Sequence, residues 1–134
     1  MSKLYSVQIP TIDETKEIAV FCEDVTTFDQ PIDILITSAF GRCYAPTPRT
    51  VFHALYRVGI DVEKLAYSPA FDLRETCQIW LSNPTQSRRA HINRIGCIEL
   101  SGARISRSDN SATEDSILKS LRAYFCMLDI AAIY

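Results

Sequence analysis

The loop from Gly41 to Pro48 holds the residues of this chain best suited to chemistry. It enters a predicted helix at Thr47, and the unpaired N–H groups and partial positive charge of a helix N-terminus suit a phosphate or a carboxylate. Arg42 and Arg49 can add charge-assisted contacts to such an anion. The loop therefore predicts an anion site, and the alternative is an ordinary helix that Thr47 caps.

Catalytic chemistry is less well supported by the sequence. Cys43 could act as a nucleophile in this loop, but no base is fixed near it, and neither His53 nor His91 is given a catalytic role. The loop has a single glycine and matches neither a dinucleotide fingerprint nor a P-loop. Whether the chain is an enzyme stays open, and no catalytic residue is predicted.

The five cysteines are an odd number at wide spacing, with no Cys-x-x-Cys pair and no histidine placed to complete a zinc set. We therefore predict no disulfide framework, no metal site and no cofactor.

Length and composition predict a single globular domain over residues 1–134, because 47% of the residues are hydrophobic and 22% are charged. A net charge of -2 gives no general attraction to nucleic acid or to anionic membranes, and the basic cluster Arg88-Arg89 with Arg94 is local. No apolar run approaches the roughly 20 residues that span a bilayer, and the N-terminus lacks a signal-peptide core. These features predict a cytoplasmic protein that binds neither membrane nor nucleic acid.

The run from Asp33 to Phe40 is apolar on both faces and ends in Gly41, which is typical of a central parallel strand covered by helices. Residues Leu73 to Leu81 fit either a helix or a strand, and we favour a helix over Asp72 to Ser82. The other expected strands are Lys3–Ile9, Glu17–Cys22 and Ile92–Leu100. Helices are expected from Thr47 to Val58, from Val62 to Ala66 and from Ser111 onward. The last of these helices has an apolar stripe of Ile117, Leu121, Phe125 and Leu128.

Strands that alternate with helices predict a three-layer α/β domain, with a mostly parallel sheet and helices on both faces. Ligands of such sheets bind beyond the carboxyl ends of the strands, where loops meet helix N-termini. The loop at Gly41 is therefore the expected binding region.

The order Glu23-Asp24-Val25-Thr26, then Asp33 to Phe40, then Gly41 and a helix from Thr47 resembles the macro domain family, whose members bind ADP-ribose. The strand at Arg94 to Leu100 and the helix from Ser111 are similar in order to later elements of that family. The resemblance implies a macro-domain-like fold for the single domain.

The resemblance also implies roles for particular residues. Asp24 would accept a hydrogen bond from the adenine amino group, and Val25 would offer a backbone contact beside it. The helix from Thr47 would lie below the phosphates. The region of the distal ribose would be lined by Ser38, Ala39 and Phe40, and Gly41 and Arg42 complete the implied ligand-binding set.

The chain departs from the family pattern at two places. Phe40 stands where the family usually has an asparagine that helps to orient the distal ribose in its hydrolytic members. Arg42, Cys43 and Tyr44 stand where those members have a run of glycines. The chain also lacks the family's last strand, second phosphate loop and final helix, so it is a fragment, a reduced fold, or a domain whose missing layer a partner supplies.

Two functions follow from the sequence. The first is a non-catalytic module that binds an ADP-ribose-like or other nucleotide ligand at the carboxyl ends of the strands. The second is a protein-interaction or self-association domain without a small-molecule ligand, in which an open sheet edge contacts a second copy or a partner chain.

Overall fold

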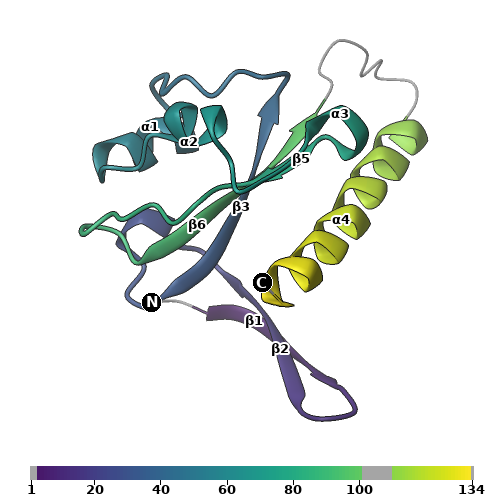
Figure 1. Ribbon diagram of the computed structural model, residues 1–134. Helices are drawn as coiled ribbons and strands as arrows, with labels where there is room; N and C mark the ends of the chain where they lie inside the picture. Colours follow the sequence, from purple (N-terminus) through teal and green to yellow (C-terminus); the bar gives the residue numbers. More distant parts are fainter. Residues whose placement is uncertain (1–2, 101–109, 134) are drawn as a thin grey trace.

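A computed structural model describes residues 3–100 and 110–133, with side chains described for 3–100 and 118–129. The strands form two separate sheets (Figure 1). The first sheet is an antiparallel hairpin of β1 (Lys3–Pro10) and β2 (Thr15–Phe21). The second has the order β3 (Ile32–Phe40), β6 (Ile92–Leu100), β5 (Ile79–Leu81) and β4 (Phe71–Leu73).

The prediction of a mostly parallel three-layer, macro-domain-like sheet is wrong. Among the described strands, β3 and β6 pair in parallel, whereas β5 pairs with β6 and β4 with β5 in antiparallel fashion, as do the hairpin strands. A parallel pair needs a crossover of a dozen or more residues, and the segment between β4 and β5 is far shorter. It consists of α3 (Arg74–Cys77) and Gln78, whose left-handed backbone at φ 59° stops the helix after one turn.

The helix favoured over Asp72 to Ser82 is therefore also wrong, because two short strands flank this single turn. Strand β3 is not central but lies at the edge of its sheet. Its apolar composition predicted burial on both faces, yet Phe40 is 63% exposed.

Helices α1 (Val51–Arg57) and α2 (Val62–Tyr67) pack on one face of the four-stranded sheet (Figure 1). Phe52 and Leu55 of α1 share a buried cluster with Trp80, Ile95 and Cys97 of the strands. The helices begin at side-chain caps, because Thr50 accepts from the backbone N–H of His53 and Asp61 from that of Lys64. This face of the sheet holds the larger of the two cores.

The predicted start of the first long helix at Thr47 is wrong by three residues. Arg49 has a φ of 68°, which no α-helix accommodates, so Thr50 becomes the cap and α1 begins at Val51. The predicted short helix and the strand Ile92–Leu100 are confirmed.

Helix α4 (Asn110–Ile133) covers the opposite face of the sheet (Figure 1). Its buried residues Tyr124 and Met127 pack against Ile79, Leu81 and Ile98. The predicted stripe is thus rotated, because Phe125 is 64% exposed while Tyr124 is buried. Ile117, which belonged to the same stripe, lies outside the residues whose side chains are described.

Within the described part of the chain, none of the helices has the length and apolar character to cross a membrane.

Candidate functional site

The hairpin has one apolar face. In an antiparallel pair, residues directly opposite each other point to the same side, and here Tyr5 opposes Val20 while Val7 opposes Ile18. With Ile9 these residues form what we call the hairpin face, and their exposed fractions run from 39% for Val7 and Ile9 to 65% for Tyr5. The turn of the hairpin projects away from the helices (Figure 1), and its apolar side chains are exposed.

The other face of the hairpin is polar. Glu17 accepts hydrogen bonds from Lys3 and, over 2.6 Å, from the Ser6 hydroxyl. Both contacts lower the pKa of the Glu17 carboxyl, with the Lys3 hydrogen bond contributing most. Lys16, which stands opposite Ile9 at the turn end of the apolar side, is paired with Glu14. The hairpin is therefore amphipathic, as a strand pair is when one of its faces meets a core.

The outer edge of β3 carries unpaired backbone groups within the described residues. The N–H of Gly41 donates to the carbonyl oxygen of Leu100 over 2.9 Å, and Phe40 stands opposite Leu100 in the parallel register. Alternate residues of a parallel ladder bond to the same neighbour, so Ile36, Ser38 and Phe40 direct their N–H and C=O groups outward, away from β6. A strand edge of this kind is a template for pairing with another chain.

Apolar side chains also line the sheet beside this edge. Ile34 and Phe125 of α4 both border an open cavity of about 520 Å³ between β3, β6 and α4. Ile36 and Phe40 lie on the same side of β3 as Ile34, and they are 39% and 63% exposed. With Leu118, which is 52% exposed, these residues form what we call the receiving face.

The loop after β3, where the sequence predicts an anion site, is occupied by the protein's own side chains. Gly41 turns the chain with a φ of 59°. The guanidinium of Arg42 donates to Glu75 over 2.6 Å, and its Nε lies 3.9 Å from a carboxylate oxygen of Glu99. Arg42 is thus engaged with carboxylates rather than directed to an empty anion site.

Tyr44 from the same loop fills the core instead of a ligand space. Its ring is 6% exposed and meets the rings of Trp80 and Phe52 edge-on, with centroids 5.6 Å and 6.2 Å away. Its hydroxyl oxygen accepts from the indole N–H of Trp80. Tyr44 therefore has a packing role.

The predicted ligand residues do not come together. Asp24 caps the turn η1 (Val25–Thr27) by accepting from the backbone and side chain of Thr26, hydrogen bonds that lower the pKa of its carboxyl. The indigo turn lies near the amino end of β3 in Figure 1. Gly41 follows the carboxyl end of this nine-residue strand, so it lies roughly 30 Å from the amino end of β3.

The remaining members of the predicted set lie around the carboxyl end of β3 but on different faces. Ala39 is buried against the α1 side, whereas Ser38 and Phe40 are exposed. Thr47 lies in the turn before α1, where its carbonyl oxygen accepts from Thr50.

Glu99 is a polar residue of this region that the sequence analysis missed. It is 8% exposed, and its Oε1 atom has no hydrogen-bond partner among the described residues. Burial raises the pKa of its carboxyl, and Arg42 opposes that shift. The signal was present as a glutamate within the apolar strand Ile95 to Leu100.

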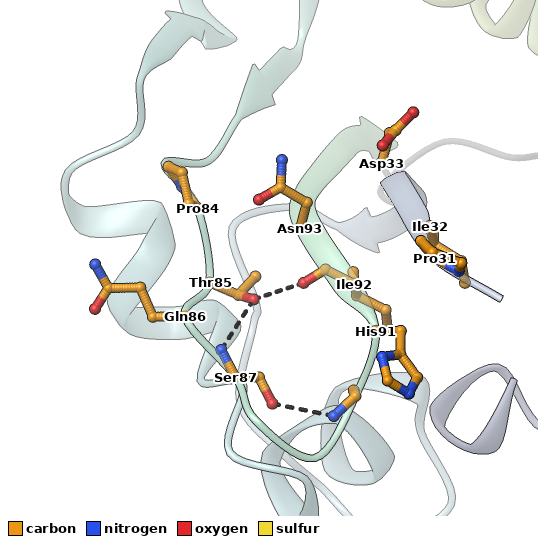
Figure 2. Close-up of a pocket in the computed structure, with 11 residues that line it drawn as sticks. Pro31, Ile32, Asp33, Pro84, Thr85, Gln86, Ser87, His91, Ile92 and Asn93 are labelled. Atoms are coloured by element: carbon orange, nitrogen blue, oxygen red, sulfur yellow. Dashed lines mark hydrogen bonds between the residues drawn. The ribbon is translucent and has the colours of Figure 1, made fainter. Parts of the chain in front are cut away.

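A second open cavity, of about 470 Å³, lies at the amino ends of β3 and β6 (Figure 2). The hydroxyl of Thr85 donates to the carbonyl oxygen of Ile92 over 2.7 Å, and that of Ser87 donates to Val58 over 2.8 Å. The Ser87 oxygen also accepts from the N–H of Ala90 (Figure 2). These hydroxyls hold the loop in shape, which explains their position without a ligand.

Comparison of the chain with protein-family models, with curated proteins and with solved structures finds no match. The resemblance to macro domains, and the nucleotide ligand that it implies, stay predictions.

Proposed function

We propose that this protein is a self-association domain that assembles through the hairpin face. The observation that carries the proposal is the apolar side of an amphipathic two-stranded sheet, which is exposed and covers none of the residues whose side chains are described. An isolated hairpin is marginally stable in water, and it needs a further layer against its apolar side. Burial of Tyr5, Val7 and Ile18 against another chain supplies that layer.

A protein partner suits the hairpin better than a lipid surface does. Anionic membranes attract clusters of unpaired lysine and arginine. Both lysines of the hairpin, Lys3 and Lys16, are ion-paired with glutamates. The hairpin therefore offers apolar area without a surplus of positive charge.

The test compares two substitutions on neighbouring residues of β1. Val7→Lys places a charge on the hairpin face, while Gln8→Lys adds the same charge to the polar face. Light scattering across a concentration series should show an oligomer for the wild type and Gln8→Lys. For Val7→Lys we expect at least tenfold weaker association, which corresponds to about 1.4 kcal/mol. A wild type that stays monomeric up to millimolar concentration would remove the proposal.

A second candidate function is the binding of a small nucleotide-like ligand at the carboxyl ends of β3 and β6. The unpartnered Oε1 atom of buried Glu99 favours it, because such an oxygen can accept from a ligand hydroxyl or amino group. Calorimetric titration with ADP-ribose tests this candidate, and Glu99→Gln should weaken binding whereas Glu75→Gln on the exposed side of Arg42 should not. Absence of heat at millimolar ADP-ribose would eliminate it.

A further inference from the structure

The hairpin face and the receiving face are both exposed in the same molecule. Tyr5 and Ile18 of the hairpin are 65% and 57% exposed, and Phe40 and Phe125 of the receiving face are 63% and 64% exposed. One surface is a strand pair with a free edge and an apolar side. The other is an unpaired strand edge with an apolar floor beside it.

From this complementarity we propose that each copy of the chain lays its hairpin on the receiving face of a second copy. The inference rests on the self-association proposed above and specifies its contact. Strand β1 of one copy continues the sheet of the other beside β3, with the hairpin face turned to the α4 side. The hairpin face then lies next to Ile36 and Phe40, and Phe125 of α4 packs against it. Addition of a strand to an open edge is a general mode of chain recognition, in which backbone hydrogen bonds supply the pairing and side chains supply the fit.

Two-fold exchange explains why the occupant is a second copy. When the hairpin of the first copy pairs with the β3 edge of the second, a two-fold axis places the hairpin of the second copy on the β3 edge of the first. The assembly then closes as a dimer. The β3 edges of both copies are then paired, and each hairpin face packs beside a receiving face, without any other chain.

The exposed area of the chain agrees with this arrangement. Every residue from 3 to 18 is exposed, so the hairpin offers a large free surface. A standard interface takes roughly 800 Å² from each partner.

The backbone of Ser38 offers a selective way to block the receiving edge. Its N–H points away from β6, so Ser38→Pro removes a donor needed by an incoming strand without removing a hydrogen bond to β6. Phe40→Lys serves as a second variant that charges the receiving face and leaves the core untouched, since Phe40 is already exposed. Both variants should be monomeric at concentrations where the wild type is dimeric.

A mixing experiment distinguishes exchange from other modes of association. Val7→Lys has a blocked hairpin and an intact edge, whereas Ser38→Pro has an intact hairpin and a blocked edge. Exchange predicts that these two monomers form one intact contact together. In NMR spectra of labelled Ser38→Pro, addition of unlabelled Val7→Lys should shift the amides of β1 and β2, and addition of unlabelled Ser38→Pro should not.

Each other outcome overturns the inference. If Ser38→Pro and Phe40→Lys associate as tightly as the wild type, two hairpin faces stack on each other, and self-association stands without exchange. If both edge variants are monomeric but the mixture shows no shifts at millimolar concentration, the exchanged contact is refuted. A monomeric wild type would remove both the inference and the function on which it rests.

Discussion

Tyr124 of α4 lies so close to Gly96 of β6 that a Cβ atom on residue 96 would stand 1.5 Å from the tyrosine hydroxyl oxygen. That hydroxyl donates to the backbone carbonyl oxygen of Trp80 over 2.9 Å. The absence of a side chain at Gly96 therefore lets the ring of Tyr124 reach the next strand. This contact determines which side of α4 meets the sheet.

Gly96→Ala should consequently destabilise the fold. The added methyl group overlaps both the hydroxyl and the ring of Tyr124, and overpacking of a dense core typically costs about 1–3 kcal/mol. We expect a loss of about 3 kcal/mol in the free energy of unfolding, measured by urea titration in the Val7→Lys background so that self-association does not contribute. Gly41→Ala is the matched control.

Gly41 has a left-handed backbone but open space around its Cα, so the control should lose only about 1 kcal/mol from backbone strain. Equal urea midpoints for Gly96→Ala and the unsubstituted background would show that α4 does not pack on β6 in this way.

The same contact explains part of what the sequence could predict. The predicted stripe that included Phe125 has the correct helical spacing. Spacing alone does not show which side of the helix packs against the sheet, because that depends on a glycine in a distant strand. Gly96 selects Tyr124 as the buried residue, and Phe125 is turned out to the receiving face. The strands Ile32–Phe40 and Ile92–Leu100 could be predicted because their apolar runs are long.

The order of the strands could not be predicted, because it depends on contacts between distant parts of the chain. Strands β4 and β5 have three residues each and are separated by the single turn α3. The apolar residues of this segment fall at helical spacing, so the sequence predicted one helix there. The apolar run of β3 is equally compatible with a central and an edge position. The alternation of Tyr5, Val7 and Ile9 indicates the hairpin face, but only the fold shows that nothing in the described chain covers it.

Tyr124→Phe tests the hydrogen bond to Trp80 separately from packing. Removal of the hydroxyl leaves the Trp80 carbonyl without this donor and should cost about 1 kcal/mol at neutral pH. Burial raises the pKa of Tyr124 above its ordinary value, so the unfolded chain ionises first, near pH 10. The free energy of unfolding of the wild type should therefore fall as the pH rises above about 10.

The phenylalanine variant lacks this ionisation, so the stability gap between the two proteins should narrow with rising pH. Tyr67→Phe is the control, because Tyr67 is 87% exposed and its loss should change neither stability nor its pH dependence. A gap that stays constant from pH 7 to pH 11 would contradict the burial of the Tyr124 hydroxyl.

Cys97 should be the least reactive cysteine described. It is fully buried beside Trp80, and burial raises the pKa of its thiol to about 11, so little thiolate forms at neutral pH. An aromatic disulfide reagent should modify the exposed Cys43 in the native protein and Cys97 only on unfolding, as followed by mass spectrometry of peptides. Modification of both at the same rate would show that the core beneath α1 is open.

Hydrogen exchange along β3 provides the last test, because its amides fall into two alternating groups. The N–H groups of Leu35, Thr37 and Ala39 point to β6, whereas those of Ile36 and Ser38 point to the open edge. In monomeric Val7→Lys the first group should exchange slowly and the second rapidly. In the wild type at associating concentrations, NMR should show the second group slowed at least tenfold, because an incoming strand now accepts from these amides. Unchanged exchange at Ile36 and Ser38 in a protein that still self-associates would move the interface away from the β3 edge, and reversed alternation would contradict the parallel register itself.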